Sequence, residues 1–311
     1  MNEKFMTKNI TLLGLATICC MLWGSAPSCI KLGYALFQIQ ADQTMNIILF
    51  AGCRFTLAGL LVLAGYSVIR RRPVLPQKTD WKAVFCLALA QTAVQYILYY
   101  IGAAHASGVK TSILSGSSTF FSVIIACLLF RQEKLTGNKF LGCIAGLAGI
   151  ILINLQGIGG EALTMNMSIL GEGCVLLSTL SSAFSAVLIR RFSQDHDAVM
   201  LSGSQFTLGG IMMIALGLAG GGHLPLISRS GLLLLFYLAI VSAVAYTLWS
   251  LLLRFNPVSK VTVYNFLMPI FGVILSTMIL GEGGIFSMRT AGALLLVCSG
   301  IWLVNFRKNA A

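Results

Sequence analysis

The sequence predicts an all-α membrane protein of ten transmembrane helices, arranged as two inverted five-helix repeats. Three observations lead to this prediction: the composition is strongly apolar, one motif recurs after half the chain, and the basic residues are distributed unevenly between the gaps. Of the 311 residues, 57% are hydrophobic and only 10% are charged. A soluble domain carries about 25% charged residues, so the composition is typical of a membrane protein.

Apolar runs long enough to cross a bilayer follow one another along the chain, whose mean hydropathy is +0.89. About 20 apolar residues span the hydrocarbon core as a helix. The short gaps between the runs leave no room for an inserted soluble domain. The first run ends without a small-residue cleavage site, so we expect a retained helix, not a signal peptide. The expected helices cover residues 10–33, 46–69, 82–103, 109–130, 138–156, 168–189, 199–219, 230–253, 259–280 and 288–306.

The repeated motif begins at Gly52 and again at Gly203. The two stretches read GCRFTLAG and GSQFTLGG and share five of eight positions, at an offset of 203 − 52 = 151 residues. An offset of half the chain indicates an internal duplication. We therefore predict a first repeat over residues 1–157 and a second over 158–311. Further pairs match at nearly the same offset: Thr92/Ser242, Tyr96/Tyr246, Tyr99/Trp249, Ser112/Thr262, Ser115/Asn265, Thr119/Pro269 and Glu133/Glu282.

Lysine and arginine set the expected orientation. If the N-terminus is cytoplasmic, the outer helix ends hold only Lys31, Lys110, Arg229 and Arg289. Because cytoplasmic segments are enriched in basic residues, both termini are expected in the cytoplasm of a cell-membrane protein. The formal charge of +12 lies in these gaps and does not indicate nucleic-acid binding. The inner side holds sixteen basic residues: Lys4, Lys8, Arg70, Arg71, Arg72, Lys78, Lys82, Arg131, Lys134, Lys139, Arg190, Arg191, Arg254, Lys260, Arg307 and Lys308.

Five helices per repeat means that the second copy enters the membrane from the opposite side. Such inverted repeats are typical of secondary transporters, in which the two halves rock about a site near the middle of the membrane. A channel-like facilitator and a non-transporting assembly factor are the alternatives. Saturable counterflow distinguishes a carrier from a channel, and any substrate flux excludes the assembly factor.

Four of the expected helices carry a face of hydroxyl, amide and aromatic side chains, which in lipid should point into the bundle. Small hydroxyl residues also serve close helix packing, and Tyr99 and Trp249 fit an interfacial aromatic belt equally well. A pocket lined by these side chains would suit a small amphipathic or zwitterionic metabolite such as an amino acid. The candidate substrate-binding residues are Gln91, Thr92, Gln95, Tyr96, Tyr99, Ser112, Ser115, Ser242, Tyr246, Trp249, Thr262 and Asn265.

Other residues are candidates for structural or gating roles. Arg54 is the basic residue inside a span, where it can pair with a carboxylate or helix end, anchor an anionic substrate or snorkel outward. Glu133 and Glu282 precede the last helix of each repeat, where a carboxylate favours the helix N-terminus. Pro27 and Pro269 can kink their helices.

Several classes of function find no support. The nine cysteines lie in apolar runs without a C-x-x-C pair, which indicates packing residues and no metal site. No catalytic motif or phosphate loop is present, so we expect neither an enzyme nor a cofactor. No carboxylate lies in mid-span to carry a proton. Gly142 and Gly146 have the spacing of a helix-packing motif, either within the chain or in a homodimer.

Several short motifs follow one another over nearly the whole chain: Trp23-Gly24-Ser25, Arg54-Phe55, Leu57-Ala58, Ala245-Tyr246, Leu248-Trp249, Leu280-Gly281-Glu282 and the Gly142/Gly149 pair. These motifs resemble those of the drug/metabolite transporter superfamily, in particular its EamA-type ten-helix branch. The resemblance implies a carrier that often exports amino acids or related metabolites, with a cavity lined by helices 82–103, 109–130, 230–253 and 259–280. The first repeat departs from the family's L-G-E element with Phe130-Arg131-Gln132-Glu133, and Gln205 replaces the arginine in the second.

Overall fold

The computed structural model describes residues 3–40, 42–105, 108–154, 168–268, 270–272 and 288–305. Every regular element in these ranges is a helix, in agreement with the predicted all-α class. The elements are α1 (Glu3–Met6), α2 (Asn9–Phe37), α3 (Thr44–Arg70), α4 (Trp81–Leu87), η1 (Ala88–Val94), α5 (Gln95–His105), α6 (Gly108–Ile124), η2 (Ile125–Leu129), α7 (Gly137–Asn154), η4 (Ile169–Gly173), α8 (Cys174–Asp195), α9 (Ala198–Ala219), α10 (Arg229–Phe255), α11 (Val258–Thr262), η5 (Val263–Phe266) and α13 (Met288–Asn305).

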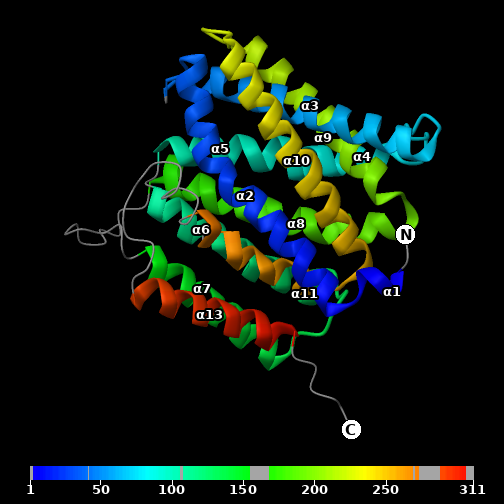
Figure 1. Ribbon diagram of the computed structural model, residues 1–311, viewed down its shortest axis with the longest axis vertical. Helices are drawn as coiled ribbons and strands as arrows, with labels where there is room; N and C mark the ends of the chain where they lie inside the picture. The colour runs from blue at the N-terminus through cyan, green and yellow to red at the C-terminus, as the bar shows by residue number, and fades with distance from the viewer. Residues whose placement is uncertain are drawn as a thin grey trace.

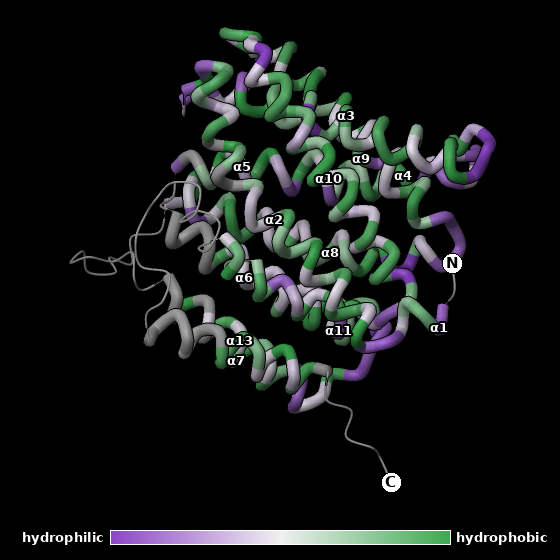
Figure 2. Tube along the Cα trace, viewed as in Figure 1, coloured by the Kyte–Doolittle hydropathy of each residue, from purple (hydrophilic) through white to green (hydrophobic). Residues whose placement is uncertain are grey.

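Membrane-spanning character is clear in the long helices. Six described helices are long and apolar enough to cross a bilayer: Asn9–Ala26, Thr44–Arg70, Trp81–Ala103, Ile169–Asp195, Ala198–Ala219 and Arg229–Phe255. Figure 2 shows hydrophobic residues along the helices and hydrophilic residues gathered at their ends, for example in the connection between α3 and α4. The full count of ten spans stays a prediction.

Three expected helices contain π-helical turns that the sequence pattern did not reveal. The expected helix 168–189 begins with the π-helical segment η4. The expected helix 82–103 is α4, the π-helical segment η1 and α5 in succession, and 109–130 ends in the π-helical segment η2. A π-helical turn places one extra residue in each turn and rotates the side chains that follow it. The hydrophobic pattern is insensitive to one such turn. The polar and aromatic face expected on helix 82–103, formed by Thr92, Tyr96 and Tyr99, is therefore not one uniform helix face. Thr92 belongs to η1 and both tyrosines belong to α5.

The repeated motif forms the contact between α3 and α9, which lie side by side at one end of the bundle (Figure 1). A Cβ atom added to Gly59 would lie 2.3 Å from Thr207 Oγ1 and 2.5 Å from the Gly203 carbonyl oxygen. One added to Gly210 would lie 2.4 Å from Thr56 Oγ1. The two copies of the motif thus pack against each other, and glycine is required because the backbones touch.

The pair α7 and α13 lies at the opposite end of the bundle (Figure 1). A Cβ atom on Gly142 would lie 2.7 Å from the Gly300 carbonyl oxygen, and one on Gly146 would lie 2.0 Å from the Phe266 ring. Both glycines therefore serve packing within the chain, which is one of the two expected roles. The homodimer stays a prediction.

Candidate functional site

Four aromatic rings from four helices meet between the two halves of the chain. Phe55 of α3 and Phe206 of α9 are stacked, with centroids 5.5 Å apart and an interplanar angle of 19°. Tyr96 of α5 lies 4.3 Å from Phe55, and Tyr246 of α10 lies 4.9 Å from Phe206. The hydroxyls of Tyr96 and Tyr246 are hydrogen-bonded to each other. We call these four residues the central ring cluster.

Trp23 of α2 extends the cluster toward Trp249. Its ring lies 4.8 Å from Tyr246 and 5.0 Å from Trp249. Trp249 is only 4% exposed, so it belongs to the core and not to an interfacial aromatic belt. Tyr99 is half-buried, with its ring 6.5 Å from Tyr96.

Arg54 lies beside the central ring cluster and is 2% exposed, which contradicts the snorkelling alternative. Its Nε donates to the Leu238 carbonyl oxygen at 3.3 Å and to Ser242 Oγ at 3.1 Å. Its Nη1 donates to the Tyr100 hydroxyl at 3.3 Å. The guanidinium therefore joins α3 to α5 and α10 through neutral acceptors.

Gln205 occupies the matching position in the second half. Its Nε2 donates to Gln91 Oε1 at 2.5 Å, and Thr92 Oγ1 donates to Gln205 Oε1 at 3.2 Å. All three side chains are buried. Gln91 and Thr92 thus lie close to Gln205, on the α9 side of the central ring cluster.

The polar faces of α6 and α11 also meet, because Thr119 Oγ1 donates to the Thr262 carbonyl oxygen at 3.0 Å. Ser115 lies one helical turn from Thr119, and Asn265 one turn from Thr262. Ser115 Oγ and Asn265 Oδ1 are buried without a hydrogen-bond partner among the described residues, as are Gln95 Oε1 and Trp23 Nε1. A buried polar atom without a partner costs about 1–3 kcal/mol, so a hydrogen bond from a polar solute or water to any of these four atoms would be favourable.

Four candidates lie wholly or partly outside the described residues. Pro269 and Glu282 fall in undescribed positions, and the side chains of Ser112 in α6 and Pro27 in α2 are likewise undescribed. Their expected roles stay predictions.

Glu133 was expected at the N-terminus of the last helix of its own repeat, and its observed contacts differ in part from that expectation. The carboxylate accepts from Lys139 Nζ of α7 at 2.8 Å, from the Ser259 backbone N at 3.2 Å and from Ser259 Oγ. Ser259 lies at the start of α11, in the second half. The carboxylate therefore lies at the N-terminus of α11 and joins the two halves of the chain, while its expected role at the last helix of its own repeat stays a prediction.

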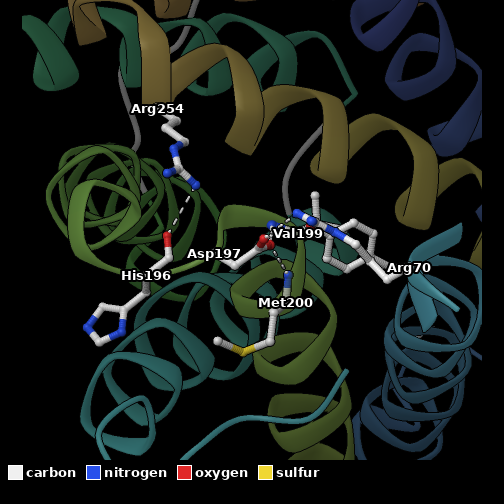
Figure 3. A network of polar contacts seen from close by, with 7 residues as sticks. Arg70, His196, Asp197, Val199, Met200 and Arg254 are labelled. Carbon is white, nitrogen blue, oxygen red and sulfur yellow. Dashed lines mark hydrogen bonds and ion pairs between the residues drawn. The ribbon is translucent and has the colours of Figure 1, made fainter. Parts of the chain in front are cut away.

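A second polar network joins the ends of α3, α8, α9 and α10 (Figure 3). Asp197 accepts from the backbone N of Val199 at 2.9 Å and of Met200 at 3.0 Å, and so caps α9. Arg70 Nη2 lies 3.5 Å from Asp197 Oδ2. Arg254 donates to the His196 carbonyl oxygen at 3.4 Å.

The candidate site offers hydroxyls, amides, aromatic faces and one guanidinium as binding groups. Within the described ranges no group of three or more His, Cys, Asp or Glu side chains is placed to hold a metal ion. All nine cysteines are free thiols. Apolar spanning helices around a buried polar and aromatic centre define a multi-pass helical membrane protein with a candidate solute site.

Comparisons with known proteins place this membrane protein in a family. The sequence profile of the EamA-like transporter family matches residues 11–155 and again 169–306, so the chain belongs to that family. The uncharacterized transporter YvbV of Bacillus subtilis is 28% identical over 85% of this chain and 84% of its own length. The uncharacterized inner membrane transporter YedA of Escherichia coli K12 is 26% identical over 84% and 80%, respectively.

A solved crystal structure supports the fold. It superposes with a TM-score of 0.75 over 96% of this chain and 97% of the other, at 16% sequence identity. At that identity the likeness concerns the fold alone. The names of the sequence relatives agree with a membrane transporter and with the family resemblance of the motifs.

The structure adds residues that were not among the sequence candidates. Trp23, Phe55, Tyr100, Gln205 and Phe206 all contact predicted site residues. Phe55, Phe206 and Gln205 lie in the repeated motif and Trp23 in the W-G-S motif, so duplication was the signal that could have found most of them. Nothing in the sequence singles out Tyr100.

Proposed function

We propose that the chain is a secondary carrier that exports small metabolites, such as amino acids, across the cell membrane by alternating access. Its two halves, residues 1–157 and 158–311, are inverted five-helix repeats with both termini in the cytoplasm. The substrate binds near the middle of the membrane, between the helices that carry the central ring cluster and the polar faces of α6 and α11.

One observation carries this proposal: sequence-matched residues make matched contacts. Phe55 lies against Tyr96, and their counterparts Phe206 and Tyr246 lie against each other. Arg54 donates to Ser242, while its counterpart Gln205 accepts from Thr92, the counterpart of Ser242. Matched contacts of this kind are what a two-fold axis through the central ring cluster would produce.

Such an axis supports alternating access in physical terms. When two copies of one unit have opposite orientations, each can adopt the conformation of the other, which exchanges an inward-facing for an outward-facing state. Tyr96 and Tyr246 meet across this axis. We expect the two hydroxyls to separate when a solute occupies the site.

The chemistry of the surrounding groups fits a small amphipathic solute. Aromatic rings stack on planar groups or attract an ammonium, at about 0.5–2 kcal/mol each. Buried atoms of Gln95, Ser115 and Asn265, which have no hydrogen-bond partner among the described residues, add hydrogen-bonding capacity. No fixed carboxylate lies among these residues.

Transport is tested in two steps. Cells overproducing the chain are loaded with an isotope-labelled amino acid and metabolite mixture, and the medium is analysed for faster efflux than from cells carrying the empty vector. Purified protein in liposomes is then tested for counterflow with the solute so found. Counterflow supports a carrier, linear flux without counterflow indicates a channel-like facilitator, and no flux for any solute contradicts the proposal.

A further inference from the structure

Arg54 is a buried cation whose hydrogen-bond partners among the described residues are neutral. The Leu238 carbonyl, the Ser242 hydroxyl and the Tyr100 hydroxyl accept its hydrogen bonds. Ion pairs among the described residues include Arg70 with Asp197 and Lys139 with Glu133, and neither involves Arg54. A buried charge is unfavourable unless an opposite charge or a full set of hydrogen bonds accompanies it, so this guanidinium favours the approach of an anion.

The hydrogen bonds of Arg54 leave one end of the guanidinium available. Nε and Nη1 are engaged, whereas Nη2 has no partner among the described residues. A guanidinium is planar and presents paired N–H groups that match the two oxygens of a carboxylate. Tyr100 and Ser242 hold this group in one orientation, which lowers the entropic cost of binding such a ligand.

The position of Arg54 places its charge at the edge of the proposed site. Its Cζ lies 5.1 Å from the centroid of the Phe55 ring, and Phe55 belongs to the central ring cluster. The matching position in the other half holds Gln205, a neutral side chain whose amide oxygen and nitrogen are both hydrogen-bonded. The centre of the molecule is therefore chemically asymmetric: the Arg54 side carries a cation, and the Gln205 side carries a neutral amide whose hydrogen bonds are already made.

From this asymmetry we infer that Arg54 binds a carboxylate of the substrate, so that the carrier selects solutes with one carboxylate and an apolar or aromatic remainder. The inference rests on the proposed carrier function and narrows its substrate class. The carboxylate binds the Arg54 guanidinium, and the remainder of the solute contacts the rings of the central ring cluster.

The test compares acids with amides of the same shape. The probes are L-leucine with L-leucinamide and phenylacetate with phenylacetamide, measured as inhibitors of counterflow and as stabilisers of the purified protein against heat. We expect each acid to bind wild-type protein at least tenfold more tightly than its amide. Arg54→Gln should weaken the acids about tenfold and leave the amides unchanged, because Gln205 shows that this fold accommodates glutamine at the matching position. The control is Arg71→Gln at the exposed end of α3, which should keep the preference for acids.

Three results overturn the inference. The first is equal binding of acids and amides by the wild-type protein. The second is that Arg54→Gln weakens both alike, as replacement of a purely structural arginine would. The third is that Arg54→Lys, which keeps the charge but loses the planar pair of N–H donors, matches wild type in every affinity. The acid–amide ratio of the wild-type protein needs no variant, so the test does not depend on the folding of Arg54→Gln. Counterflow of amides but not acids overturns the inference and leaves the carrier function intact, whereas no flux of any solute contradicts the carrier itself.

Discussion

Replacing Gly59 by alanine adds one methyl group where α3 and α9 approach most closely. The new Cβ atom would lie 2.3 Å from Thr207 Oγ1, 2.4 Å from the Thr207 backbone N and 2.5 Å from the Gly203 carbonyl oxygen. Two of these atoms are backbone, so no rotamer change relieves the overlap. Ordinary contact begins at 3.4 Å, and the helices must therefore separate by about 1 Å.

The cost follows from two opposing effects. Overpacking of this kind costs about 3 kcal/mol, the upper end of the usual range, because the backbone cannot yield locally. The higher helix propensity of alanine relative to glycine stabilises the folded protein by about 1 kcal/mol. The net loss of about 2 kcal/mol is roughly 30-fold in the ratio of folded to unfolded protein.

The assay is the thermal unfolding midpoint of purified protein in detergent, together with the fraction that elutes as a single species. The matched control is Gly65→Ala in the same helix, where a Cβ atom has nothing within 4 Å. We expect a lower midpoint for Gly59→Ala and an unchanged or higher midpoint for Gly65→Ala. Equal stability of the two variants would refute the close contact between the two copies of the motif.

Three further predictions concern the site and the connections between the halves. Tyr96→Ala and Tyr246→Ala should each weaken substrate affinity in counterflow about tenfold, the equivalent of about 1.4 kcal/mol. The control Leu233→Ala, at an exposed and lipid-facing position, should leave the affinity unchanged. Unchanged affinity in both tyrosine variants would show that the substrate does not bind at these rings. Glu133→Ala should lower the free energy of unfolding by about 3 kcal/mol, because it leaves the half-buried Lys139 without its carboxylate partner. An unchanged thermal midpoint would show that this ion pair adds no stability. Asp197→Ala should cost about 1–2 kcal/mol through loss of the α9 cap, and a midpoint equal to wild type would contradict that capping role.

Much of the fold could be predicted because its causes are visible in composition. Apolar runs must become helices in lipid, since every backbone hydrogen bond has to be made within the segment. The repeated glycines and threonines of α3 and α9 pack on each other because only small residues allow such close backbones. The π-helical turns of η1 and η2 could not be predicted, because one extra residue per turn leaves hydropathy unchanged.

The candidate site could be predicted only in part. Pairing by offset selected Tyr96 and Tyr246, whose hydroxyls do meet. It did not show that Thr92 bonds to Gln205, because a side-chain partner 113 residues away depends on helix packing that periodicity does not encode. The sequence also left three roles open for Arg54: pairing with a carboxylate or helix end, binding an anionic substrate, or snorkelling. Snorkelling is distinguished from an interior position by the burial of the side chain, which only the structure gives.

The central claim is that the two halves cross the membrane in opposite directions around one site. It is tested most directly by reporter fusions placed after Glu161, at the start of the second half, and after Ala311, at the end of the chain. A reporter that is active only outside the cell should be active at Glu161 and silent at Ala311, and a reporter that is active only in the cytoplasm should give the reverse. Fusions that report the same side of the membrane at both positions would contradict the inverted repeat.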